Sequence, residues 1–204
     1  MASAALAPQA NNVEKRTRSA LVAWSIVALC VTVTGLYANV PPLGVQLTIA
    51  GLTLAQIACY ALSGSFREWT LNICMKRLVL FQSWRIVPGL AFLYYYSALH
   101  KFTFAFAVVG GIGDSLVALT VPFAHMLIEP RTKAKWFGLL GWQLFALIDL
   151  LLVIRAAVVG NLQSPTVMEP LRHFPMSLLP TILVPLTLFI HFISLAQIQR
   201  QLRK

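Results

Sequence analysis

The sequence has few charged residues and very few acidic ones. Only 11% of its 204 residues are charged, whereas a soluble domain carries about 25%. Six Asp and Glu residues stand against sixteen Lys and Arg residues. With 58% hydrophobic residues and a mean hydropathy of +0.76, the chain lacks the polar surface of a soluble domain. We therefore interpret it as a polytopic membrane protein in which helix packs against helix.

Cysteine is also scarce. Cys30 and Cys59 lie inside apolar segments and Cys74 lies beside one, and three cysteines cannot form an even set of pairs. We expect buried free thiols rather than disulfides or metal ligands. The sequence also lacks a nucleotide-binding loop and a cluster with metal-ligand spacing. It therefore predicts no metal site, identifies no catalytic residue and leaves any cofactor unknown.

The sequence is rich in apolar runs. Each is about 19–25 residues long, which is the length that a hydrocarbon core of ~30 Å requires. The runs predict an all-α transmembrane bundle of six helices, with crossings at residues 20–38, 43–62, 78–99, 104–128, 136–157 and 176–198. Residues 1–19 are predicted to be a mobile basic segment, residues 20–198 the transmembrane domain, and residues 199–204 a basic tail. The first run is long for a signal peptide and no A-x-A site follows it, so we expect a retained helix.

The positive charges fall mainly on one side of the predicted bundle. The N-terminal segment, the loops at residues 63–77 and 129–135, and the C-terminal tail hold twelve Lys and Arg residues, against three on the opposite side. This asymmetry predicts a multi-pass inner-membrane protein with both termini in the cytoplasm. The basic excess is thus a topology signal that also attracts the anionic headgroups of the lipid bilayer. Without a binding motif, nucleic acid is not an expected partner.

Four ionisable residues lie deep within the predicted crossings: Arg85, Asp114, Asp149 and His191. At a rise of ~1.5 Å per residue, Asp114 lies about 15 Å and Asp149 about 12 Å from the outer ends of their helices. Arg85 and His191 lie about 10 Å from the inner ends of theirs. The sequence therefore predicts two acids near mid-membrane, with Arg85 and His191 in a second tier below them.

Helical spacing predicts that these residues face the bundle interior. Asp114 shares a stripe with the small residues Ala107, Gly111 and Ala118, which let a neighbouring helix pack close to the acid. A purely structural alternative stays open, in which the acids are protonated or capped by hydroxyl groups and serve only helix packing. Arg85 could also extend its side chain toward the cytoplasmic side, since Cβ atoms tilt toward the helix N-terminus.

The run Gly111-Ile112-Gly113-Asp114 resembles the GxGD signature of intramembrane aspartyl proteases. That resemblance implies two acids that share a proton around a water molecule, and Asp149 would be the second acid. The sequence departs from the family, because the partner acid there precedes the GxGD helix and here follows it, after Ile148. The later Pro-Ala-Leu motif of the family is absent. Because of these departures, we rank a protease below two other hypotheses, which are given at the end of this subsection.

Residues 84–203 resemble a family of small bacterial membrane proteins without a named activity. The features that carry the resemblance are Trp84-Arg85-Ile86, the GxGD helix, Asp149 in the next helix, and the segment LLPTILVPLTLFIHFISLAQIQR at residues 178–200. The resemblance implies a polytopic helical architecture and implies no mechanism.

Two further functions remain as hypotheses. In the first, Asp114 and Asp149 bind or translocate a proton, a cation or a small ligand, with Arg85 and His191 as partners on the inner side. In the second, the chain is a structural subunit or assembly factor of a larger membrane complex, and other membrane subunits are its partners. Neither hypothesis makes the chain an enzyme.

Overall fold

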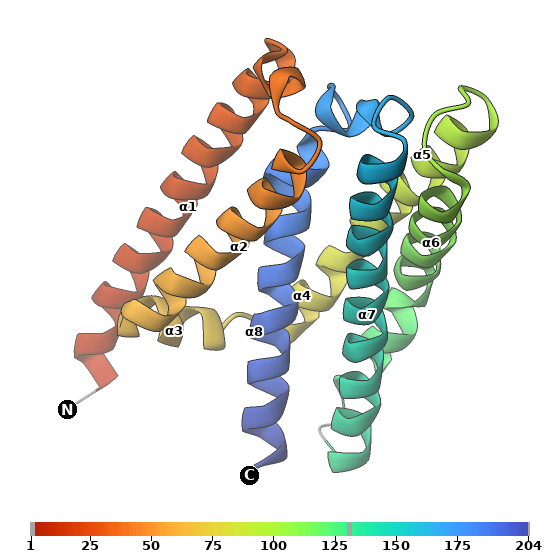
Figure 1. Ribbon diagram of the computed structural model, residues 1–204. Helices are drawn as coiled ribbons and strands as arrows, with labels where there is room; N and C mark the ends of the chain where they lie inside the picture. Colours follow the sequence, from red (N-terminus) through yellow and green to blue (C-terminus); the bar gives the residue numbers. More distant parts are fainter. Residues whose placement is uncertain (1–2, 130–131, 204) are drawn as a thin grey trace.

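The computed structural model describes residues 3–129 and 132–203, with side chains from residue 12 onward. This part of the chain forms helices α1 to α8 and short helical turns η1 to η4, and it contains no strand. The helices lie side by side, and the start of α1 and the end of α8 lie at the same end of the bundle (Figure 1). Residues 1 and 2 of the segment predicted to be mobile, and the basic residues Arg131 and Lys204, lie outside the described residues.

Five of the described helices are long and apolar enough to cross a membrane. They are α1 (Ser3–Val33), α2 (Gly44–Leu62), α6 (Phe104–Met126), α7 (Lys133–Gln163), and the π-helical turn η4 (Leu179–Leu183) continued by α8 (Val184–Leu202). This all-helical architecture fits an integral membrane protein of unknown specific activity.

The first helix differs from the prediction at both ends. α1 begins at Ser3 rather than at residue 20, because the Ala-rich and basic residues before the apolar run favour a helix without apolar periodicity. It ends at Val33, shortly before the turn η1 (Leu36–Asn39). Gly35 adopts a left-handed conformation with φ of 77°, which commonly terminates a helix. The mobility of residues 1–19 stays a prediction.

The predicted third crossing at residues 78–99 is not a single helix. Its parts are α4 (Met75–Phe81), the 3-10 turn η2 (Gln82–Arg85) and α5 (Ile86–Ser97). Pro88 explains the break, because its ring displaces the carbonyl group four residues before it and its nitrogen cannot donate a hydrogen bond. This division is why five helices, and not six, have the length of a complete crossing.

The segments between the crossings are partly helical. The polar segment at residues 63–77 contains α3 (Gly64–Leu71), which begins where the Ser63 hydroxyl accepts a hydrogen bond from the Phe66 amide. α7 begins after the capping residue Thr132 and extends six residues beyond the predicted end at residue 157. Helices end at caps and breakers rather than at the last apolar residue. The following loop is correspondingly shorter and contains the turn η3 (Glu169–Arg172).

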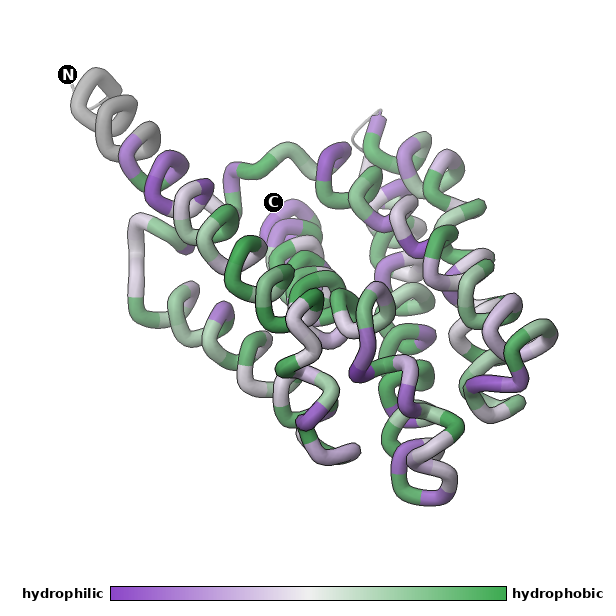
Figure 2. Tube along the Cα trace, turned by 90° about the horizontal axis from the view of Figure 1, so that it is seen from above, coloured by the Kyte–Doolittle hydropathy of each residue, from purple (hydrophilic) through white to green (hydrophobic). Residues whose placement is uncertain are grey.

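Helices α6 and α8 hold the bundle together. α6 packs against α5 and α7, and α8 packs against α7 on one side and α2 on the other. Figures 1 and 2 show α1 and α2 on one side of α8 and α5 to α7 on the opposite side. α1 lies against α3 and η4, and Trp24 Nε1 donates a hydrogen bond of 3.0 Å to the Thr181 carbonyl.

The three cysteines are free, but all of them are exposed. The prediction of buried thiols was therefore wrong. A membrane helix that is apolar on all sides presents part of that surface to lipid. An apolar neighbourhood in the sequence thus does not imply burial inside the protein.

Gly89 brings α5 close to α6. A Cβ atom at position 89 would lie 2.5 Å from Ser115 Oγ and 3.0 Å from the Gly111 carbonyl oxygen. We expect Gly89→Ala to lower the free energy of unfolding by about 1–3 kcal/mol, because the two helices would have to separate. Gly51→Ala is the matched control, since nothing lies within 4 Å of that position. Circular dichroism during unfolding in detergent micelles measures both variants, and equal stabilities would contradict the expectation.

Candidate functional site

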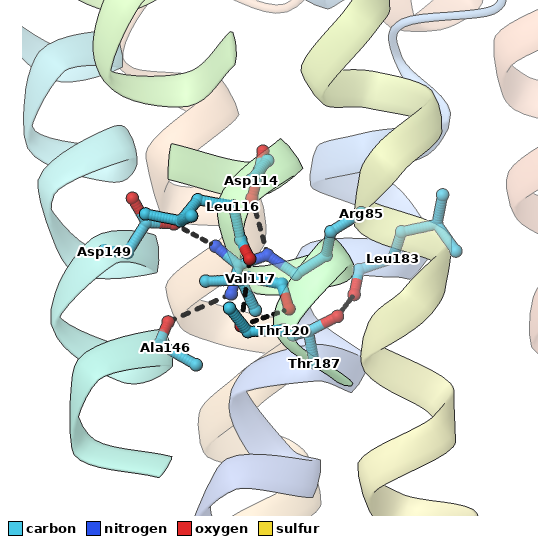
Figure 3. A network of polar contacts seen from close by, with 9 residues as sticks. All are labelled: Arg85, Asp114, Leu116, Val117, Thr120, Ala146, Asp149, Leu183 and Thr187. Carbon is cyan, nitrogen blue, oxygen red and sulfur yellow. Dashed lines mark hydrogen bonds and ion pairs between the residues drawn. The ribbon is translucent and has the colours of Figure 1, made fainter. Parts of the chain in front are cut away.

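Arg85 bridges two carboxylates in the interior of the bundle. Its Nε–H donates to Asp114 Oδ1 at 2.5 Å, and its Nη2 donates to Asp149 Oδ2 at 2.5 Å. Its Nη1 donates to the Ala146 carbonyl oxygen at 3.0 Å. Figure 3 shows the guanidinium group with Asp114 above it and Asp149 and Ala146 on the neighbouring helix. The turn η2 and the helices α6 and α7 therefore meet at one side chain.

The cluster of Arg85, Asp114 and Asp149 is almost completely removed from solvent. The exposed fraction is 0% for Arg85, 4% for Asp114 and 8% for Asp149. Removing charges from water costs several kcal/mol per ion unless partners compensate them. Here two carboxylates share one guanidinium group, so the cluster carries one excess negative charge when both acids are ionised.

Small residues on α6 make this arrangement possible. The ideal Cβ position at Gly113 overlaps the Asp149 carboxylate, so only glycine leaves room for the acid of the neighbouring helix. Gly111 in turn lies against Leu93 of α5. Short side chains allow helix backbones to approach closely in a membrane. Gly113 therefore leaves room for the Asp149 carboxylate of α7, and Gly111 leaves room for Leu93 of α5.

His191 belongs to a second buried pair. Its Nδ1 lies 2.8 Å from Gln143 Oε1, and both side chains are fully buried. Gln143 lies one helical turn from Ala146 on α7, so the pair lies beside the charged cluster. Within the described part of the chain, His191 Nε2, Gln143 Nε2 and Ser194 Oγ are buried without a hydrogen-bond partner. Buried polar atoms of this kind are commonly partnered by ordered water.

Two clusters of buried apolar side chains flank the site. One buried cluster contains Leu139, Ile193 and Ile198, and another contains Phe92, Phe106 and Met168. Nearby threonines do not join the cluster, because the Thr120 and Thr187 hydroxyl groups donate to carbonyl groups of their own helices (Figure 3). The charged groups therefore interact mainly with one another.

The four predicted site residues all lie in the interior of the bundle, and their depths in a membrane stay a prediction. Arg85 binds both acids directly, as its predicted partnership with them requires, so the alternative of an extension toward the cytoplasmic side was wrong. The direction of the Arg85 side chain is determined by its ion pairs with two carboxylates rather than by the tilt of its Cβ atom. His191 binds Gln143 and neither acid.

Sequence reasoning missed the roles of Gln143 and Ala146. Both share one face of α7 with Asp149, since the three residues are spaced three positions apart. A glutamine within an apolar run was the signal that could have identified the partner of His191. The Ala146 carbonyl has no comparable signal, because any residue carries that group.

The geometry supports neither a metal centre nor a protease dyad. Among the described residues, no group of three or more His, Cys, Asp or Glu could hold a metal ion. Asp114 and Asp149 each bind Arg85, whereas an aspartyl protease requires two acids that share a proton around a water molecule.

The described part of the chain thus combines long apolar helices with an Arg–Asp–Asp cluster inside the bundle. The chain belongs to the family described as a domain of unknown function (DUF8737), which matches residues 42–199. The match includes α2 and all four predicted site residues, and it begins earlier than the resemblance over residues 84–203. Membership in an uncharacterised family is confirmed, and a bacterial origin stays a prediction. No curated protein and no solved structure matches the chain.

Proposed function

We propose that this chain is a multi-pass protein of the inner (cell) membrane whose Arg85–Asp114–Asp149 cluster binds and releases a proton. We further propose six crossings, with α4, η2 and α5 together forming the third. These elements cover residues 75–97, which suffices for a hydrocarbon core of ~30 Å. The excess of Lys and Arg at the end of the bundle that holds the start of α1 and the end of α8 supports cytoplasmic termini.

The charge balance of the cluster carries the proposal. Two carboxylates bind one guanidinium group in a site that is almost fully buried. An uncompensated charge inside a membrane protein is costly, and ionisable residues at this depth commonly mark proton or ion pathways. A single bound proton removes the excess charge and leaves one neutral acid beside one ion pair.

A proton fits the cluster better than a metal cation does. A cation takes several oxygen ligands, and Arg85 already occupies one oxygen of each carboxylate. The guanidinium charge would also repel a second cation. A proton requires only one carboxylate oxygen and can exchange between the two acids while Arg85 holds the other.

The His191–Gln143 pair supports a route toward the cytoplasmic side. His191 is fully buried on α8, and Ser194 lies one turn closer to the C-terminal end. The unpartnered atoms His191 Nε2 and Ser194 Oγ are the groups that water molecules would connect. A proton would leave the carboxylates along this polar face of α8.

Neutralising either acid tests the proposal. Asp114→Asn and Asp149→Asn each leave a balanced pair of one carboxylate and one guanidinium group, so we expect both variants to fold. Proton flux into proteoliposomes, followed with an enclosed pH-sensitive dye, is expected to fall to the level of protein-free vesicles in both. Infrared spectroscopy should also show a protonated carboxyl band in the wild type that both variants lack.

Glu68→Gln is the control, because Glu68 is an exposed carboxylate on α3. It should retain both the flux and the infrared band. If the wild type shows neither, the proposal fails and the structural-subunit hypothesis gains support. If the band is present without flux, the cluster binds a proton and translocation is excluded.

A further inference from the structure

A cavity of about 830 Å³ lies between α1 and the rest of the bundle. Its walls come from the middle of α1, the second half of α2, the helices α3 and α4, and the first half of α8. The helix α3 in its wall lies toward the end of the bundle where α1 starts and α8 ends (Figure 1). The Arg85–Asp114–Asp149 cluster does not line this cavity, so its occupant is independent of the proposed proton site.

The walls are apolar along most of their length and basic at one end. Aromatic and aliphatic side chains predominate, among them Trp24, Leu52, Trp69, Phe189 and Ile193. Arg16 lines the end near the start of α1, and Ser63 and Ser65 contribute hydroxyl groups there. Figure 2 shows the same change along α1, from hydrophilic near its start to hydrophobic further on.

The charge of Arg16 is free for a ligand. Arg16 is exposed, and it forms no ion pair with any residue that the structure describes. Ser63 accepts a hydrogen bond from the Phe66 amide, which leaves its hydroxyl hydrogen available to an anion. Basic pockets between membrane helices on the cytoplasmic side are typical binding sites for lipid phosphates.

The volume favours acyl chains over a further helix. A transmembrane helix ~10 Å wide and ~30 Å long would fill roughly 2,400 Å³, which is far more than this cavity offers. Its mainly apolar walls fit hydrocarbon chains of smaller cross-section than a helix. The acyl chains of one phospholipid meet this requirement.

We infer that this cavity binds one anionic phospholipid, with its acyl chains between α1, α2 and α8 and its phosphate on Arg16 and the Ser63 and Ser65 hydroxyl groups. The lipid would fill the space that separates α1 from α8. The apolar walls disfavour a polar metabolite. Among the described lining residues Arg16 is basic and none is acidic, so a headgroup with a net negative charge is favoured over one that carries its own cation.

Native mass spectrometry of the protein in mild detergent tests the inference, with phosphatidylglycerol or phosphatidylcholine added as the probe. The wild type is expected to retain phosphatidylglycerol and to release phosphatidylcholine. Arg16→Gln should weaken phosphatidylglycerol binding about fivefold, the effect of one basic residue at a membrane surface. Arg18→Gln is the matched control, because Arg18 is exposed but does not line the cavity.

A second pair of variants tests the cavity itself. Ala55 lines the cavity and Ala50 of the same helix is exposed outside it. Ala55→Trp should abolish lipid retention, whereas Ala50→Trp should leave it unchanged. Equal retention of both lipids, equal effects of the two arginine variants, or retention by Ala55→Trp would each overturn the inference.

Discussion

Replacing Arg85 with methionine is expected to lower the free energy of unfolding by about 3–5 kcal/mol, because removal of one partner leaves buried charges without compensation. Arg85 is the shared partner of Asp114 and Asp149, and it also donates to the Ala146 carbonyl. Its loss therefore affects three helices at once. Unfolding in detergent micelles, followed by circular dichroism, measures the difference.

The triple variant Arg85→Met/Asp114→Asn/Asp149→Asn distinguishes lost charge compensation from lost packing. It lacks all three charges, so we expect it to recover most of the stability that Arg85→Met loses. Arg155→Gln is the control for an exposed arginine and should remain within about 0.5 kcal/mol of the wild type. A triple variant no more stable than Arg85→Met would show that Arg85 stabilises the bundle through packing instead.

Adding one methyl group at Gly113 is expected to disrupt the site almost as strongly as removing an acid. The Cβ atom of Gly113→Ala would overlap the Asp149 carboxylate, so the acid must leave Arg85 or α7 must move away from α6. We expect the free energy of unfolding to fall by about 1–3 kcal/mol. Proton flux and the infrared carboxyl band should change as they do in Asp149→Asn.

Gly141→Ala is the matched control, because Gly141 lies on α7 with nothing within 4 Å. The same substitution should stabilise the helix there by about 0.5–1 kcal/mol, since alanine loses less backbone entropy than glycine. The two alanine variants are therefore expected to change stability in opposite directions. A Gly113→Ala variant with wild-type stability and proton binding would show that neither property depends on the present position of the Asp149 carboxylate.

The thickness of a bilayer made much of the architecture predictable. The crossings expected at residues 43–62 and 104–128 agree closely with α2 and α6, because the required number of apolar residues follows from the rise of a helix. Helix ends were less predictable, since they depend on backbone features. Gly35 ends the regular helix before the apolar run ends, and Pro88 divides a run that looked continuous.

The interior position of each polar residue was predictable, whereas its individual contacts were not. Asp114 and Asp149 were expected at similar depths, and a single side chain binds both of them. Depth alone placed Arg85 with His191, although the two residues have different partners. A depth estimate uses the rise along one helix and contains no information about the rotation of that helix relative to its neighbours.

The order of apolar runs and basic segments by itself determined that this chain forms long apolar helices, since hydrocarbon thickness and backbone hydrogen bonding allow few alternatives. Only the tertiary structure decided that Arg85 reaches two acids and that His191 pairs with Gln143. The reason is that these contacts join residues 29 to 64 positions apart on different helices. Their formation depends on the close approach that glycines such as Gly113 permit, and a one-dimensional pattern does not specify which helix will approach.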